Sequence, residues 1–410
     1  MTYMAIYDLI CLQKLKRINA MHDQLFLHNL ISKSLSFIHK ARLKILLGTV
    51  FSLINNGRLT LSSLGQNLTG TAKVKNKIKA VDRLLGNKLL RKDSFYIYQA
   101  LSKKLLNNAH EATILLDYSG CCTKEHWIIR ASIIGEGRSI IVYQETHSLE
   151  VYDSSKIKKS FLIKLKKIIP NNIKVTLVTD AAFRTPWFKL VKSFGWEFLG
   201  RARGKVKIKL LKEGWWKQVK SLFKHATSIP KFLGEAAMSI NHQFPVYLYT
   251  YKGKLYGRKV TRKKNRHLYP GKQEQYSKLN REPWIIVSSQ NLKPKKAIAL
   301  YKKRMQIEQN FRDDKNERWG FAWRFSRTKN YERYSILLLI AYIASLVLWL
   351  IGRAAEAKNL HKDFQANTSK KRTLSYLTLG KQVLKHAIDK IRQEDILAAI
   401  DDVAYLQTTY

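Results

Sequence analysis

The sequence predicts an α/β protein that has helical regions at both ends and a basic, β-rich insertion within its core. Apolar residues recur at helical spacing over 21–107, whereas short apolar runs alternate with amphipathic helices over 108–200. That alternation stops over 201–283 and returns over 284–356, and helical spacing follows over 357–410. Because alternating strands and helices are typical of an α/β fold, we expect the insertion to interrupt a single α/β core.

The composition indicates a folded protein with a polyanionic partner. Hydrophobic residues make up 45% of the 410 residues and charged residues 25%, as in an ordinary globular protein. The 75 Lys and Arg against 29 Asp and Glu give a formal net charge of +46. Self-repulsion on this scale destabilises a compact chain unless a polyanion is present, so nucleic acid is the expected partner. An anionic membrane surface is the weaker candidate, because the charge is spread along the chain.

Cysteine usage and hydropathy bear on the cellular compartment. The three cysteines form neither a disulfide framework nor a metal-ligand spacing, which favours a reducing cytoplasm. The uncharged run Ile336–Ile351 is shorter than the ~20 residues that span a bilayer, so it is predicted to be a buried helix. Residues 1–20 are predicted to be an optional leader, with Met21 as an alternative start. We therefore expect a cytoplasmic protein without membrane association.

Region 21–107 contains a candidate helix-turn-helix. The segment Leu59–Leu68 has leucines at helical spacing, and after a Thr-Gly-Thr turn a second apolar stripe begins at Val74. The rest of this second helix is mostly basic and includes Lys73, Lys75, Lys77 and Lys79. A basic second helix is typical of a reader of the DNA major groove. A solvated basic helix of a bundle is the alternative.

Two aspartates are predicted at the carboxyl ends of buried strands. Asp117 follows the apolar run Thr113–Leu116, and Asp180 follows the run Ile173–Thr179. Neighbouring strand ends face one crevice, where two carboxylates would repel each other unless they shared a cation. Magnesium suits such oxygen ligands. Taken alone, a strand-terminal aspartate is more often a turn former or a helix N-cap than a metal ligand.

A helix predicted from Pro294 to Lys315 carries a polar stripe. Tyr301, Arg304, Glu308 and Lys315 fall within roughly 60° of one helix face, at about 100° per residue. Glu308 can ligate a metal ion, Arg304 and Lys315 can neutralise phosphate, and Tyr301 can donate a hydrogen bond. The alternative is a solvent-facing stripe whose Arg304–Glu308 pair contributes only about 0.3 kcal/mol.

The insertion 201–283 has 21 Lys or Arg residues against four acidic residues, so it is expected to lie along a phosphate backbone. Its densest positive patch consists of Arg258, Lys259, Arg262, Lys263, Lys264 and Arg266.

The Y-x2-R-x3-E-x6-K spacing on the predicted helix, together with the two aspartates, resembles the signature of DDE transposases of the IS-four family of bacterial insertion sequences. Within this family the likeness is greatest to the insertion-sequence-ten transposases, and it covers about 21–405. The other segments that carry the likeness are Val81–Asn87, Pro186–Trp187, Glu282–Trp284, Lys303–Glu308 and Phe364–Thr368.

The resemblance implies a ribonuclease-H-like core and cut-and-paste transposition. In this reaction one strand is nicked, the freed 3′-hydroxyl forms a hairpin on the other strand, the hairpin is opened, and the 3′-hydroxyl attacks target DNA. Asp117, Asp180 and Glu308 would hold two Mg²⁺ ions, with Mn²⁺ as a substitute. The implied partners are double-stranded DNA (terminal inverted repeats and target) and a second copy of the chain in a synaptic homodimer. We expect region 357–410 to serve dimerisation.

The resemblance also assigns roles to single residues. Trp284 matches an aromatic residue that helps a base leave the stack, although a buried strand tryptophan is the alternative. Arg201 matches a position that contacts the end DNA, and a generic phosphate contact is equally expected. Two positions depart from the pattern. Gln309 stands where close relatives have an acid, and Met305 stands where another branch has Trp.

Two other functions stay open at this level. A catalytically inactive remnant of an element would still bind the terminal repeats, although the intact triad and unbroken frame favour activity. A general ribonuclease-H-like nuclease would not need a helical region that reads sequence.

Overall fold

The computed structural model of the chain divides into two compact units. The first unit holds residues 1–110, 118–173 and 306–409, and the second holds essentially 111–117 and 174–305. The residues that the structure describes are 31–56, 58–120, 126–253, 282–318 and 320–408.

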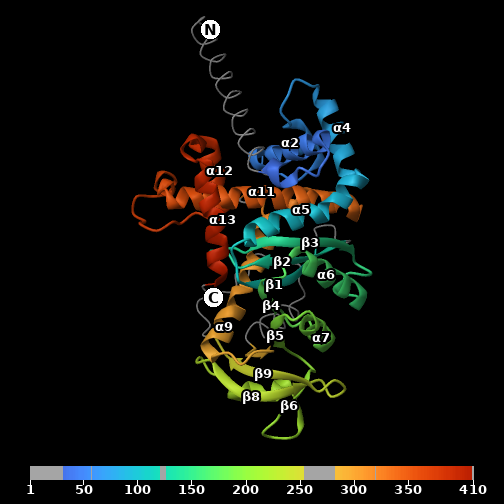
Figure 1. Ribbon diagram of the computed structural model, residues 1–410, viewed down its shortest axis with the longest axis vertical. Helices are drawn as coiled ribbons and strands as arrows, with labels where there is room; N and C mark the ends of the chain where they lie inside the picture. Colours follow the sequence, from blue (N-terminus) through green and yellow to red (C-terminus); the bar gives the residue numbers. More distant parts are fainter. Residues whose placement is uncertain (1–30, 57, 121–125, 254–281, 319, 409–410) are drawn as a thin grey trace, which may run out of the picture. The chain divides into compact units, whose positions relative to one another are not determined.

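The first unit begins with a helical region (Figure 1). Helix α3 is capped by Thr60, whose side chain accepts a hydrogen bond from the Ser63 N–H, so it starts ahead of the Ser62–Ser63 pair. A Cβ on Gly65 would lie 2.5 Å from the Ile78 backbone, so only glycine allows α3 and α4 to approach so closely. The elements are η1 (Lys33–Leu35), α2 (Lys40–Asn56), α3 (Leu61–Gln66), α4 (Val74–Leu85) and α5 (Lys88–Leu106).

The middle of the first unit is an antiparallel hairpin followed by a helix. Strand β2 (His126–Ile133) pairs with β3 (Ile140–Ser148), with a register shift after Ala131. Helix α6 (Ser155–Ile168) follows, capped by Ser154, and packs against α5 and β3. Its buried face consists of Phe161, Leu162, Leu165 and Ile168.

The core of the first unit is the long apolar helix α11 (Tyr331–Ala357), which packs against α2, α5, α12, α13 and β3. It is long and apolar enough to cross a membrane, but 89% of its most apolar window is buried inside the protein. The predicted buried helix is therefore confirmed. The other elements of this part are α10 (Met305–Lys315), η3 (Trp323–Phe325), η4 (Leu360–Phe364), α12 (Tyr376–His386), η5 (Ile388–Lys390) and α13 (Gln393–Thr408).

The second unit is built on a mixed sheet. Its strands follow the order β1-β4-β5-β10-β9-β8-β6-β7, in which β1, β4 and β5 are parallel and the others antiparallel. The elements are β1 (Glu111–Gly120, its last three residues in the first unit), β4 (Lys174–Thr179), α7 (Thr185–Ser193), β5 (Glu197–Ala202), β6 (Lys207–Leu210), β7 (Trp216–Gln218), η2 (Val219–His225), β8 (Lys231–Met238), β9 (Phe244–Tyr251), β10 (Trp284–Ser288) and α9 (Pro294–Lys303).

The structure changes two details of the prediction. Asp117 lies within β1, which continues to Gly120, and not at the end of the strand. The helix predicted over Pro294–Lys315 is broken at Arg304 into α9 and α10. The break follows from a tightened turn, because the Arg304 N–H bonds to the Tyr301 carbonyl three residues back, at 3.2 Å.

Candidate active site

The two aspartates lie on neighbouring strands of the second unit. Leu116 of β1 is in register with Thr179 of β4. Asp117 and Asp180 are therefore the next residues after a paired position on two parallel strands, which lie about 5 Å apart. Asp117 is 9% exposed and Asp180 is half-buried. Oδ1 of Asp180 accepts a hydrogen bond from the Ala182 N–H at 2.9 Å, as expected of a turn former.

Arg304 supplies a positive charge to this pair of carboxylates. Its Nη1 lies 3.2 Å from Oδ2 of Asp117, and both side chains are about one-eighth exposed. Carboxylates on adjacent strands add negative charge to one edge of the sheet, and Arg304 neutralises part of it at Asp117. An all-oxygen donor pair of this kind fits a divalent cation such as Mg²⁺.

Tyr301 and Trp284 stand beside Arg304 in the second unit. The Arg304 guanidinium lies 5.7 Å from the Tyr301 ring centroid, and the Tyr301 and Trp284 rings meet edge to face at 5.0 Å. Burial raises the pKa of Tyr301, and the charges of Arg304 and Arg201 oppose that rise. The phenol therefore stays protonated and available as a hydrogen-bond donor at neutral pH. Trp284 is half-buried, not sealed within the core.

Arg201 is held by two residues that lie just before β10. Its Nη2 donates to the Pro283 carbonyl at 3.4 Å and lies 3.9 Å from Glu282. Burial lowers the pKa of Arg201 from its usual value, with Glu282 and Tyr301 opposing, which leaves it cationic. Arg203 binds the same carboxylate at 2.8 Å, so one acid restrains two guanidinium groups.

Glu308 and Lys315 belong to the first unit. Glu308 is half-buried on α10, and the Lys315 Nζ donates to Oγ of Ser119 at 2.7 Å. The boundary between the units thus passes between Arg304 and Glu308. Within the described part of the chain, no group of three His, Cys, Asp or Glu side chains forms a metal site. The structure brings together Asp117, Asp180, Tyr301, Arg304 and Trp284, and separately Glu308, Lys315 and Ser119.

Sequence reasoning missed a buried ion pair that holds α10. Arg130 of β2, fully buried, donates to Asp314 at 2.8 Å and to Gln144 at 2.9 Å. Its guanidinium lies 4.2 Å from the Phe311 ring centroid, a cation–π contact. The signal was a single charge inside an otherwise apolar strand, because such a charge must find a partner.

The predicted DNA contacts outside this site fall into two groups. Lys73, Lys75 and Lys79 are exposed at and along α4, and Lys77 is half-buried there. The basic patch of the insertion lies outside the described residues: Arg258, Lys259, Arg262, Lys263, Lys264 and Arg266.

The site therefore combines strand-borne carboxylates with a guanidinium and a phenol, side chains that can bind a metal ion and a phosphate group. Residues 107–344, more than half of the chain, match the family "Transposase DDE domain". The chain belongs to this family and is therefore a transposase, a protein type that cuts and joins DNA. A search of curated proteins found no match.

Proposed function

We propose that the protein is an active cut-and-paste transposase of the IS-four branch, near the insertion-sequence-ten transposases. The observation that carries this proposal is the pair Asp117 and Asp180 on adjacent parallel strands, with Arg304 against Asp117. Its substrates would be the inverted ends of its own element and a target duplex. It would act in the bacterial cytoplasm, on the nucleoid, as a synaptic homodimer.

In the proposed mechanism Asp117, Asp180 and Glu308 would hold two Mg²⁺ ions. When bound, such ions activate a nucleophile and stabilise the leaving oxygen of an in-line displacement at phosphorus. Arg304 and Lys315 neutralise the non-bridging phosphate oxygens, and protonated Tyr301 donates a hydrogen bond to the same group. In the first step water attacks phosphorus, the P–O3′ bond breaks, and a 3′-hydroxyl and a 5′-phosphate result.

Later steps reuse the same groups because each is a displacement at phosphorus. The freed 3′-hydroxyl attacks the opposite strand to form a hairpin, water opens the hairpin, and the 3′-hydroxyl then attacks target DNA. Trp284 provides a stacking surface for a base that leaves the helix during hairpin formation. The exposed lysines of α4 contact the phosphates of the end DNA.

The test is cleavage of a labelled duplex that carries the element's terminal repeat, in Mg²⁺ and in Mn²⁺. We compare the unmodified protein with Glu308→Ala and with Glu317→Ala, a control that removes an exposed acid paired with Arg58. Nicking and a hairpin product that only Glu308→Ala abolishes, with binding retained, support the proposal. Specific binding without cleavage by any of the three proteins indicates an inactive remnant, and cleavage indifferent to the terminal repeat indicates a general nuclease.

A further inference from the structure

Helix α10 presents two opposite faces. At about 100° per residue, Glu308 and Lys315 lie within roughly 20° of each other on one side. Five polar residues occupy an arc of about 140° on the other side. They are Gln306, Gln309, Asn310, Asp313 and Asp314.

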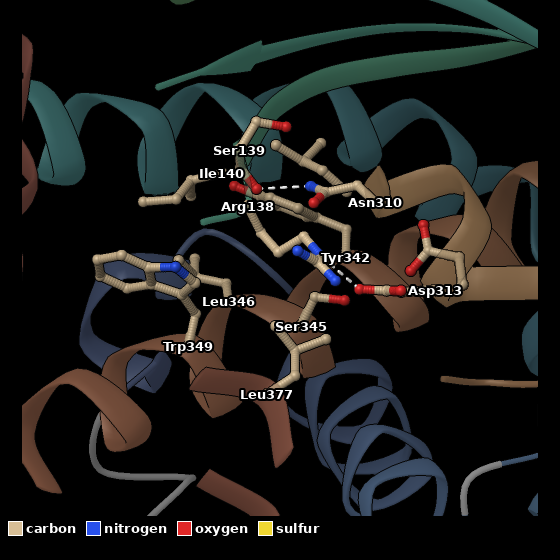
Figure 2. Close-up of a pocket in the computed structure, with 12 residues that line it drawn as sticks. Arg138, Ser139, Ile140, Asn310, Asp313, Tyr342, Ser345, Leu346, Trp349 and Leu377 are labelled. Carbon is tan, nitrogen blue, oxygen red and sulfur yellow. Dashed lines mark hydrogen bonds and ion pairs between the residues drawn. The ribbon is translucent and has the colours of Figure 1, made fainter. Parts of the chain in front are cut away.

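The five-residue face is bonded to the turn 134–139 between β2 and β3 and to β2 itself. The Gln306 side chain makes two bonds to Gly135, accepting from its N–H at 3.1 Å and donating to its carbonyl at 2.8 Å. Asn310 donates to the Ser139 carbonyl at 2.5 Å (Figure 2). These two bonds restrain the N-terminal end of α10, where Gln306 lies, against the turn.

Arg138 makes the remaining connection between the turn and α10. Its Nε lies 2.5 Å from Oδ2 of Asp313 (Figure 2). Its Nη1 donates to Gln309 at 2.8 Å. The Arg138 side chain is 31% exposed, so these bonds are partly screened from water. Gln309 is thus a neutral acceptor for the arginine that also binds Asp313.

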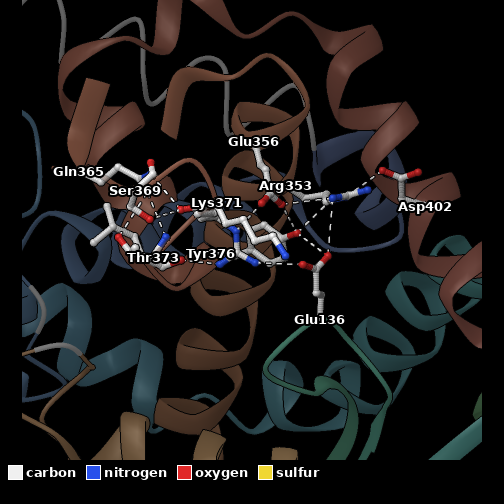
Figure 3. A network of polar contacts seen from close by, with 11 residues as sticks. Glu136, Arg353, Glu356, Gln365, Ser369, Lys371, Thr373, Tyr376 and Asp402 are labelled. Atoms are coloured by element: carbon white, nitrogen blue, oxygen red, sulfur yellow. Dashed lines mark hydrogen bonds and ion pairs between the residues drawn. The ribbon is translucent and has the colours of Figure 1, made fainter. Parts of the chain in front are cut away.

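The turn itself has little freedom. A Cβ on Gly135 would lie 2.2 Å from the Arg138 carbonyl oxygen, so only glycine fits there. Gly137 has φ of +76°, a conformation that favours glycine. Glu136 is also bonded, accepting from Tyr376 at 2.9 Å (Figure 3). It also pairs with Arg372 at 3.3 Å. The turn therefore contacts α10 through one set of side chains and the C-terminal helical region through another.

We propose that the β2–β3 turn positions Glu308, and that Arg138 is a positioning residue that sets the rotation of α10. The inference rests on the proposed function, in which Glu308 is a metal ligand. A rotation of α10 by about 20° would move a carboxylate about 5 Å from the helix axis by roughly 2 Å. Because Mg²⁺ demands near-ideal octahedral geometry at 2.0–2.1 Å, a shift of that size removes a ligand.

The expected consequence is a defect in metal use. Loss of the Arg138 bonds loosens α10 without touching the DNA-binding helices or the two aspartates. A misplacement of about 1 Å can cost about a hundredfold in rate. We expect excess metal to recover part of this loss, because binding of the ion selects the correct rotation of α10.

The experiment uses the full chain and compares Arg138→Ala, Arg138→Lys and Gln309→Ala with Lys358→Ala. Lys358 pairs with Asp395 in the same unit, and none of its described bonds reaches α10. The measurements are the cleavage rate of the terminal-repeat duplex against Mn²⁺ concentration, Mn²⁺ bound to the protein–DNA complex by electron paramagnetic resonance, and duplex affinity without metal. Glu308→Gln is measured in parallel and tests the proposed function by itself.

We expect Arg138→Ala to raise the half-saturating Mn²⁺ concentration about tenfold and to reduce bound Mn²⁺, with duplex affinity unchanged. Arg138→Lys and Gln309→Ala, which each keep part of the contact, should show smaller shifts of the same kind. Metal dependence equal to that of Lys358→Ala in all three variants would overturn the proposal, as would a rate loss that no Mn²⁺ concentration reduces. If Glu308→Gln cleaves normally, the proposed function fails instead. If Arg138→Ala does not fold, Gln309→Ala decides.

Discussion

Two Arg–Asp pairs of this protein have the same chemistry but differ in their exposure to solvent. Arg130–Asp314 in the first unit is fully buried, 2.8 Å long, and packed against Phe311. Arg304–Asp117 in the second unit is 3.2 Å long, and each side chain keeps about one-eighth of its surface exposed. In the first pair Arg130 also contacts Gln144 and Phe311, which suits a structural role. The second is partly exposed to solvent, which suits the proposed site for metal and phosphate.

The difference shows what burial does to a charge. Burial raises the pKa of Asp314, and Arg130 offsets that rise, so neither partner is stable there without the other. The second pair is more exposed, at 12% and 13% against 0% and 7%, so removal of one partner leaves a carboxylate that water can reach more easily. The first pair should therefore be visible mainly in the free energy of unfolding, and the second mainly in activity.

The largest expected effect comes from the aspartate of the open pair. Asp117→Asn keeps the shape of the side chain but removes the charge of a proposed metal ligand. Several kcal/mol of transition-state stabilisation depend on bound metal, so cleavage should fall by about a thousandfold or more. Single-turnover nicking of the terminal-repeat duplex measures the loss. Unfolding in urea should change little, and a large loss of stability would make this pair structural like the other.

Next is the arginine of the buried pair. Arg130→Ala leaves Asp314 uncompensated in the core, so the free energy of unfolding should fall by about 3–5 kcal/mol. Urea denaturation at pH 7 measures it. The double variant Arg130→Met, Asp314→Leu replaces both charges by apolar groups and should recover much of the loss. A drop below about 1 kcal/mol in Arg130→Ala would contradict the assigned structural role.

Glu145 is a third carboxylate, and it tests whether hydrogen-bond partners can lower a pKa more than burial raises it. Burial by itself would raise the pKa of Glu145, but hydrogen bonds from His147 and Lys164 outweigh it and lower that pKa to about 2. The folded pKa lies below the ordinary glutamate value of 4.5, so this contribution to stability is complete above pH 4.5 and is lost as the pH falls toward 2. The shift corresponds to up to about 3 kcal/mol. Unfolding from pH 7 to pH 3 measures it, and Glu145→Gln should lack this part of the acid dependence.

The smallest effect is expected for Arg304→Lys. Lysine keeps the positive charge near Asp117 but loses the planar guanidinium that can grip phosphate with two bonds. Cleavage should fall about tenfold, or about 1.4 kcal/mol, and stability should change by less than about 1 kcal/mol. Parallel cleavage and urea experiments check both values. If Arg304→Lys loses as much stability as transition-state stabilisation, the Arg304–Asp117 pair is no more specific to activity than the Arg130–Asp314 pair.

The sequence by itself determined the kinds of element and much of the candidate site. The apolar run Ile173–Thr179 predicted β4, and the uncharged run Ile336–Ile351 predicted the buried helix α11. Such runs are local signals, because burial demands a continuous apolar face. The strand-borne aspartates and the polar spacing around Glu308 were found in the same way, from the order of residues along the chain.

Tertiary structure decided what depends on partners distant in sequence. It broke the predicted helix at Arg304, kept Asp117 inside β1, and paired Arg130 with Asp314, 184 positions away. It also bonded Gln309 to Arg138 of the β2–β3 turn. The physical reason is that a buried charge or amide must be satisfied by whichever group the fold brings to it. Local spacing shows that such a partner is needed, and only packing chooses it.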